Sequence, residues 1–173
     1  IEPEITTKTP EIIEAINMLN QLVSTEITYD FGDYKEVLNG STIHKWIQID
    51  GFTVTLNYDE VYNYVKSLSS KYNTFGKKRT FITTEGVTRI LPSGGFGWRI
   101  NRTNESQELY ELICKGIVTI REPVYTYRGA VHGELNDIGN TYIEINLTDQ
   151  HMYVYQDGYI VLESDFVSGD IKS

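Results

Sequence analysis

A single cysteine, Cys114, is the only side chain of this 173-residue protein that could act as a thiol nucleophile. Thiol catalysis requires the thiolate, which a neighbouring histidine usually forms and holds. Cys114 follows Leu109, Leu112 and Ile113 on the apolar stripe of a predicted helix. We therefore expect a buried structural cysteine. The lone thiol also excludes an internal disulfide and a multi-cysteine zinc site.

The three histidines, His44, His132 and His151, are far apart in the sequence. Metal ligands usually cluster at a spacing that a helix or a turn sets. The scatter predicts ordinary loop and strand histidines, and the sequence indicates no metal ion or other cofactor.

Glycoside cleavage would require two carboxyl groups that face each other across a cleft. The sequence offers three close pairs, but two of them stand near predicted helix starts, where a favourable interaction with the helix dipole explains them. A self-contained hydrolase is therefore disfavoured. The pairs are Asp59/Glu60, Glu108/Glu111 and Glu134/Asp137.

Glycine and aromatic residues are interspersed in the run from Ser93 to Trp98. A phosphate-binding loop would continue with Lys-Ser/Thr and open a helix, and this run does neither. One interpretation is a tight turn that folds Trp98 onto the core. The other is that Phe96 or Trp98 stacks on sugar faces along a glycan groove.

The net charge of −9 argues against nucleic acid as a partner and against general polyanion binding. Basic residues nevertheless concentrate between Lys71 and Arg102, where seven of them accompany one acid, Glu85. This stretch is either a solvated hairpin face or a site for polymers that carry carboxylates or phosphates. The resulting candidate ligand-binding residues are Phe96, Trp98, Lys77, Lys78, Arg79 and Arg99.

Helical spacing and capping residues predict about three main helices, at residues 9–23, 57–72 and 104–115. Mixed antiparallel strands lie between them, including a hairpin at 78–91 and a strand at 96–100. Helices and strands follow no repeating βαβ order. The expected fold class is therefore α+β.

Apolar and polar side chains alternate between residues 142 and 167, which is typical of half-buried β-strands. Asp157-Gly158 supplies a tight turn, because a type I′ hairpin needs positive φ at both central residues. A meander of two or three strands cannot bury enough surface to be a domain alone. We therefore expect its exposed edge to dimerise with a second chain through residues 142–167, or to pack on the preceding domain.

The end of the chain resembles the opening strands of the L,D-transpeptidase (YkuD-type) catalytic domain. The matching pieces are Asn140-Thr141-Tyr142, Gln150-His151-Met152, Tyr155-Gln156-Asp157-Gly158 and Val167-Ser168-Gly169. The preceding part resembles the peptidoglycan-binding-type domain found before that catalytic domain in some Gram-positive enzymes. Its matching pieces are Tyr72-Asn73-Thr74, Arg79-Thr80-Phe81, Thr83-Thr84-Glu85-Gly86 and Gly94-Gly95-Phe96-Gly97-Trp98.

The resemblance implies three segments. Residues 1–8 would be a flexible N-terminus, and residues 9–139 a peptidoglycan-binding-like α+β domain. Residues 140–173 would be the N-terminal β meander of an incomplete, all-β catalytic domain.

The resemblance also implies a parent enzyme that cross-links the stem peptides of peptidoglycan. The family's cysteine takes the acyl group of a tetrapeptide stem and releases D-alanine, and an amine on a neighbouring stem resolves the thioester. That cysteine stands in a Ser-His-Gly-Cys run. Here Val131 precedes His132-Gly133 and Glu134 follows it, so no catalytic residue can be assigned and the chain itself is expected to be inactive.

The expected role is to position the parent enzyme on peptidoglycan or another cell-wall polymer. The alternative is a structural spacer or protein-interaction module of a cell-surface protein, without glycan affinity. Both imply an extracellular place, at the cell wall or the outer face of the membrane of a Gram-positive bacterium. No apolar run approaches the ~18 residues of a membrane span, so membrane contact would come only through an anchor outside this chain.

Overall fold

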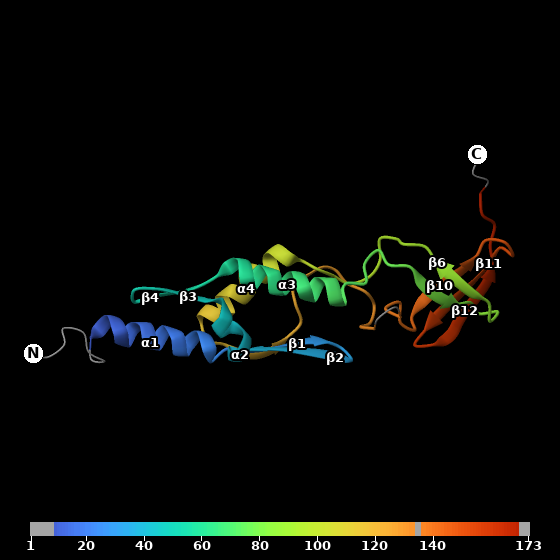
Figure 1. The fold of residues 1–173 in the computed structure, drawn as a ribbon. Coiled ribbons are helices and arrows are strands. Elements are labelled where there is room, and N and C mark those ends of the chain that lie inside the picture. Colours follow the sequence, from blue (N-terminus) through green and yellow to red (C-terminus); the bar gives the residue numbers. More distant parts are fainter. Residues whose placement is uncertain (1–8, 134–135, 170–173) are drawn as a thin grey trace, which may run out of the picture. The chain divides into compact units, whose positions relative to one another are not determined.

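The computed structural model describes residues 9–133 and 136–169, so the predicted flexible segment 1–8 lies outside the described residues (Figure 1). Contacts divide the chain into two compact units, and neither is continuous in sequence. The first unit comprises Ile1–Asn73 and Arg99–Thr126, and the second comprises Thr74–Trp98 and Tyr127–Ser173. The predicted domain boundary near residue 139 separates two consecutive stretches of sequence, whereas these units are not continuous in sequence. The boundary therefore stays a prediction.

The first unit mixes helices and short strands, which confirms the expected α+β class. Its elements, in chain order, are α1 (Pro10–Val23), β1 (Glu26–Phe31), β2 (Tyr34–Asn39), α2 (Gly40–Ile43), the 3-10 helix η1 (His44–Trp46), β3 (Ile47–Asp50), β4 (Thr53–Leu56), α3 (Tyr58–Tyr72), β7 (Arg99–Ile100), α4 (Arg102–Cys114), β8 (Val118–Arg121) and β9 (Tyr125–Tyr127).

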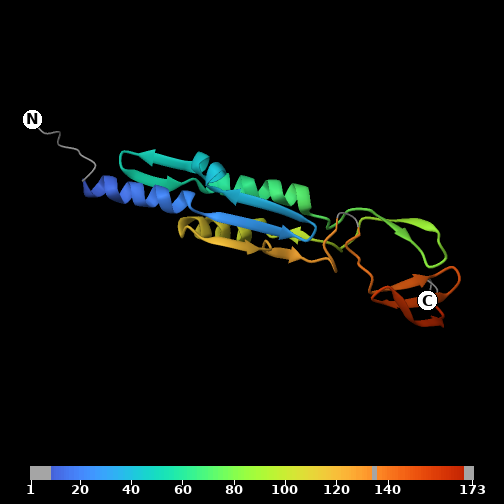
Figure 2. The ribbon, with the colours of Figure 1, turned by 90° about the horizontal axis from the view of Figure 1, so that it is seen from below.

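Three strands of the first unit form a sheet of order β2-β1-β8, and Figure 2 shows them side by side. β1 pairs antiparallel with β2 across a tight turn at Gly32. It pairs in parallel with β8, from Glu26↔Val118 to Tyr29↔Arg121. The sequence did not predict this parallel pair, because its crossover contains both α3 and α4 and leaves no local signal.

The core of the first unit lies between this sheet and the helices. Alternate residues of β1 (Ile27, Tyr29 and Phe31) are buried, as a strand with one covered face requires. α3 and α4 lie on one side of β1 and β2 in Figure 1. Their apolar stripes complete the core, at Val61, Val65, Leu68, Leu109 and Ile113.

Capping side chains set the helix starts. Asn57 accepts a hydrogen bond from the backbone N–H of Asp59 and starts α3, as predicted. α4 begins two residues before the predicted Asn104. The reason is that Asn101 is the cap, since its side-chain oxygen accepts from the backbone N–H of Asn104.

The second unit contains a hairpin and a three-stranded meander. The hairpin joins β5 (Arg79–Ile82) to β6 (Thr88–Leu91) through a turn with Gly86 at φ 78°, as predicted. Asp157 and Gly158 have φ of 51° and 86°, which confirms the predicted type of turn within the meander. The meander consists of β10 (Tyr142–Asn146), β11 (His151–Gln156) and β12 (Tyr159–Asp165), in that order in the sheet.

The hairpin packs on one face of the meander. Thr84 donates its backbone N–H and its hydroxyl to the carboxylate of Glu144, and its Oγ1 lies 2.8 Å from the Tyr155 hydroxyl. The ring of Phe81 meets the ring of Tyr142 edge to face at 5.5 Å. One of the two expected outcomes, packing on the preceding segment, is therefore observed. Dimerisation through the meander stays a prediction.

A buried carboxylate connects the helix α4 to the sheet in the first unit. Glu105 is fully buried, and it accepts hydrogen bonds from the Tyr29 hydroxyl at 2.5 Å, from Arg121 at 2.9 and 3.1 Å, and from the Val124 N–H at 2.6 Å. Burial raises the pKa of Glu105, although these donors act in the opposite direction. The carboxylate therefore ties β1, β8 and α4 together inside the core.

Replacing Glu105 with alanine should lower the free energy of unfolding of the first unit by about 3–5 kcal/mol, because it leaves the buried Tyr29 hydroxyl without its partner and removes the buried half of the Arg121 ion pairs. Residue-resolved amide hydrogen exchange of β1 and α4 would measure the loss. Glu108→Ala is the matched control. Glu108 is half exposed on the same helix and contacts the same Arg121, so its loss should cost no more than about 1 kcal/mol. Equal effects of the two variants would contradict a structural role for Glu105.

Candidate functional site

In the second unit, two segments lie side by side, and together they hold most of the predicted ligand-binding residues. The backbone N–H groups of Thr74 and Phe75 both donate to the Trp98 carbonyl at 3.0 Å, and the Gly76 N–H donates to the Phe96 carbonyl at 3.3 Å. These bonds join the start of the hairpin segment to its end. Five predicted residues are thereby brought together: Lys77, Lys78, Arg79, Phe96 and Trp98. Arg99 lies on β7 in the first unit.

Gly97 allows the two segments to approach each other. Its φ is 118°, and a Cβ at this position would lie 2.5 Å from Nη2 of Arg79 and 2.8 Å from the Phe75 nitrogen. No side chain fits there. The same backbone conformation explains why the strand predicted at 96–100 is limited to Arg99–Ile100.

Arg79 is buried, with only 4% of its surface exposed, and its guanidinium is fully engaged. Its Nε lies 2.5 Å from Oδ1 of Asp137, and its Nη2 lies 2.7 Å from Oδ2. It also donates to the carbonyl groups of Lys77 and Thr74, at 2.8 and 3.2 Å. Arg79 therefore supports the surrounding loops, and its burial argues against direct contact of this side chain with a ligand.

Asp137 is fully buried and completes this cluster. Besides the Arg79 contacts, it accepts a hydrogen bond from the Thr74 hydroxyl, and its backbone carbonyl accepts from the Ala130 N–H at 2.9 Å. Burial alone would raise the pKa of Asp137, but hydrogen bonds from Arg79 and Thr74 hold it below its ordinary value. The sequence pointed to Asp137 only as one member of the carboxylate pair Glu134/Asp137 and not as the partner of Arg79, because it stands in a polar stretch at 136–140 that carries only turn signals.

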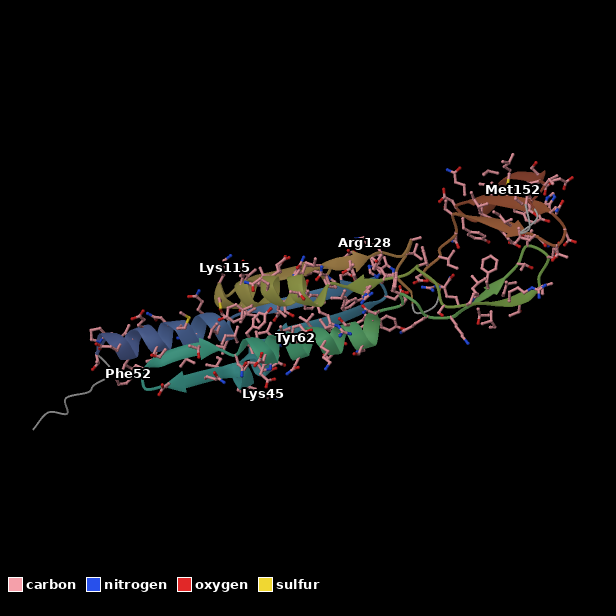
Figure 3. The ribbon with its side chains drawn as sticks, turned by 90° about the horizontal axis from the view of Figure 1, so that it is seen from above. Lys45, Phe52, Tyr62, Lys115, Arg128 and Met152 are labelled. Atoms are coloured by element: carbon pink, nitrogen blue, oxygen red, sulfur yellow. The ribbon has the colours of Figure 1, made fainter. Side chains whose placement is uncertain are left out.

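Trp98 is packed rather than exposed. Only 7% of its surface is accessible, its ring stacks on His132 at 3.9 Å, and its Nε1–H donates to the Val131 carbonyl at 2.7 Å. The guanidinium of Arg128, which Figure 3 labels, lies over the same ring at 5.6 Å. Of the two interpretations of Trp98, the structure therefore favours the one in which the ring folds onto the core.

An exposed surface remains beside this cluster, and we call it the cationic aromatic surface: Lys77, Lys78, Phe96 and Tyr127. Phe96 is 40% exposed and lies over the Arg79 guanidinium at 5.2 Å. Tyr127 is also exposed and stacks on Phe75 at 4.3 Å. Both lysines are exposed, and neither forms an ion pair with a described residue. The surface thus offers aromatic faces and two positive charges without internal partners.

This arrangement suits binding rather than bond making or breaking. Aromatic faces stack on sugars, and ammonium groups attract carboxylates or phosphates. Cys114 lies elsewhere, half-buried at the end of α4 in the first unit, where burial raises the pKa of its thiol. The described residues contain no group of three potential metal ligands and no helix long and apolar enough to cross a membrane.

Comparison with protein families matches residues 5–119 to the putative peptidoglycan binding domain family. A search of curated proteins gave no match.

Two solved structures are similar over most of the chain. One is an Enterococcus faecium L,D-transpeptidase carrying a C442S mutation, with 30% sequence identity and a TM-score of 0.66, covering 92% of this chain. The other is the Ldtfm-avibactam carbamoyl enzyme, with 29% identity and a TM-score of 0.68, covering 93% of this chain. The present chain spans 63% of the length of each of these structures.

Asp137→Asn should destabilise the second unit by about 3–5 kcal/mol, because it leaves the buried Arg79 charge without its counter-ion. Hydrogen exchange of β5, β6 and β10 would report the loss. Asp30→Asn is the control, since it removes an ion pair of similar type that is exposed, with Lys35, and should cost at most about 1 kcal/mol. Unchanged protection in Asp137→Asn would show that the ion pair does not hold the unit together.

The same ion pair should give the second unit an acid dependence. Because the pKa of Asp137 is lowered on folding, its stabilisation is complete above the ordinary aspartate pKa of ~3.9 and is lost as the pH falls through the folded-state value. A carbon-detected NMR titration of the Asp137 carboxyl should place its midpoint below that value. In Asp137→Asn this contribution to the pH dependence should vanish. A midpoint at or above the ordinary value would contradict the assignment.

Proposed function

Since the chain belongs to the peptidoglycan-binding domain family over residues 5–119, we propose that it is the N-terminal part of a cell-wall L,D-transpeptidase and that it positions this enzyme on peptidoglycan. The cell-wall context of this chain is supported by its membership of the peptidoglycan-binding domain family and by its similarity to two L,D-transpeptidase structures. The positioning role and the cross-linking activity of the longer protein are the proposal.

The observation that carries the positioning role is the cationic aromatic surface. Its two lysines have no ion-pair partner among the described residues, and its two partly exposed aromatic rings come from segments that contact the residues just before these lysines. Wall polymers combine sugar faces with carboxylate or phosphate groups, and such a ligand matches both features of the surface. A spacer without glycan affinity has no need of this combination.

Residues 140–173 are, in this proposal, the first strands of the catalytic domain. Their meander has one face under the hairpin and an opposite face with exposed apolar side chains, at Ile143, Ile145 and Leu162. An uncovered apolar face of this kind is unusual on a finished domain. We infer that further strands of the longer protein cover it.

The catalytic thiol and its histidine would belong to that further part. Cys114 cannot replace them, because its thiol is half-buried and its pKa is raised. The longer protein would cross-link stem peptides through its own cysteine, and the present chain is expected to be inactive. Its place would be the cell wall or the outer face of the membrane of a Gram-positive bacterium, with any membrane anchor outside this chain.

Sedimentation of the purified chain with insoluble peptidoglycan sacculi tests the positioning role. We expect retention that survives moderate salt. The double variant Lys77→Gln/Lys78→Gln should bind roughly 5- to 30-fold more weakly, because two exposed charge contacts contribute about 1–2 kcal/mol together. Phe96→Ala should also reduce retention, through loss of stacking.

The matched control is Lys45→Gln/Lys66→Gln, which removes the same charge from exposed lysines of the first unit (Lys45 is labelled in Figure 3). This control should bind like the unmodified chain. If no form of the protein sediments with sacculi, the spacer alternative replaces the proposal. If both double variants lose binding equally, the attraction depends on net charge and the cationic aromatic surface is not the site.

A further inference from the structure

The first unit contains a cleft of about 290 Å³ between α1 and the β3–β4 hairpin. The helix wall of this cleft is one stripe at the spacing of helix turns: Glu11, Glu14, Ala15 and Met18. The opposite wall is the segment Phe52–Val54, and Figure 3 labels Phe52 at the hairpin turn beside the start of α1. The cleft shares no residue with the cationic aromatic surface, so it is a separate site.

Apolar side chains on both walls of the cleft remain exposed. Phe52 is 45% exposed and Met18 is 40% exposed. The same two elements carry further exposed apolar side chains, at Ile16 on α1 and Ile49 on β3. Within α1 only Leu22 is buried in the core. Large apolar side chains that gather in this way on a helix and its neighbouring hairpin are typical of a surface that a partner covers.

The size of the cleft favours a protein partner over a free small molecule. Pockets that enclose drug-sized ligands usually measure about 300–1,000 Å³, and this cleft is smaller. It has room for one or two apolar side chains that another surface inserts, as anchor residues do at protein interfaces. Its helix wall extends over two turns, and a partner helix would present side chains at the same period.

Every charged side chain of α1 and of the β3–β4 hairpin is acidic. Glu11 and Glu14 line the cleft, and Asp50 ends β3. Neither Pro10–Val23 nor Ile47–Leu56 contains a lysine, arginine or histidine. All three carboxylates are exposed, and none forms an ion pair with a described residue. Charge complementarity therefore favours a basic partner, whereas anionic lipid or a second copy of the same acidic surface would be repelled.

We propose that this cleft is the docking site for a basic amphipathic helix of a partner protein. Apolar side chains of that helix would enter the cleft beside Met18 and Phe52, and its lysine or arginine side chains would pair with Glu11 and Glu14. This site does not depend on the wall-binding role, because the cationic aromatic surface lies in the second unit. The chain would bind a protein through its first unit and the wall through its second.

An NMR titration of the ¹⁵N-labelled chain with a synthetic helical peptide of leucine and lysine, Ac-LKKLLKLLKKLLKL-NH₂, tests the proposal. We expect amide shifts in residues 11–18 and 52–54. The double variant Glu11→Gln/Glu14→Gln should bind this peptide roughly 5- to 20-fold more weakly, because two exposed charge contacts are lost. Phe52→Ala should also weaken binding, without any change of charge. An analogue of the peptide with glutamate in place of lysine should not bind.

The matched control is Asp59→Asn/Glu60→Gln, which removes two exposed acids from the first turn of α3, outside the cleft. This control should bind the peptide like the unmodified chain. If the two double variants lose binding equally, the attraction depends only on net charge and the proposal is wrong. Binding without shifts in residues 11–18 and 52–54, or equal binding by Phe52→Ala, would likewise overturn it.

The other possible occupants of the cleft give distinct results in the absence of peptide. Nuclear Overhauser contacts between residues 1–8 and Phe52 would show that the chain fills its own cleft. Shifts of residues 11–18 that grow with protein concentration would show a second copy there, and shifts caused by phosphatidylglycerol vesicles would show a lipid surface. Each of these results would overturn the proposal. Glu11→Gln/Glu14→Gln should sediment with sacculi like the unmodified chain, so failure of peptide docking would leave the wall-positioning function standing.

Discussion

The buried ion pair between Arg79 and Asp137 holds together two segments that are distant in sequence, since the two residues stand 58 positions apart. Arg79 begins the hairpin, Thr74 precedes it, and Asp137 comes from the segment that leads into the meander. A buried charge is costly unless paired and hydrogen-bonded, and here each oxygen of the carboxylate has a partner. The fixed geometry of the guanidinium makes the pairing directional. The position of the hairpin relative to the strands of the second unit therefore depends on this one contact and on the packing beside it.

This arrangement explains why the compact units do not follow the sequence. The chain leaves the first unit at Thr74, forms the hairpin, and returns at Arg99. The peptidoglycan-binding family covers residues 5–119, so it includes the hairpin, yet the hairpin packs with residues beyond that range. A segment of the binding family thus contributes to the unit that holds the meander. Its Thr84 donates two hydrogen bonds to one carboxylate of β10, which is a specific contact rather than a chance apposition.

Local features were predictable from the sequence, and long-range polar contacts were not. The turns at Gly86 and at Asp157-Gly158 follow from the backbone freedom of a few adjacent residues. Helix starts follow from caps, although Asn101 and Asn104 are both plausible caps and only the hydrogen bond separates them. Glu105 looks like an ordinary first-turn acid of α4, and nothing nearby in sequence announces Tyr29 or Arg121 as its partners.

The six candidate ligand-binding residues stay a prediction. Their clustering in the sequence pointed to segments that the structure joins, and five of the six lie together in the second unit. The sequence could not separate the exposed lysines from the buried Arg79, because that difference depends on Asp137, which stands 58 positions away. The glycine-rich run predicted a turn near Trp98. The structure gives a different reason for glycine at position 97, because the nearby Arg79 side chain leaves no room for a Cβ there.

The two faces of the meander differ in what each can accept. Glu144 and Tyr155 lie on the face that receives the hairpin, and their polar groups are satisfied there by Thr84. On the other face Ile143 pairs with Val154, which in turn pairs with Leu162, and these aliphatic side chains can be satisfied only by apolar contact. A polar, directional contact selects one partner segment, while an apolar face accepts any surface of matching shape. The hairpin therefore fixes where the meander sits within its unit, and the apolar face is the side on which a larger β domain can be built.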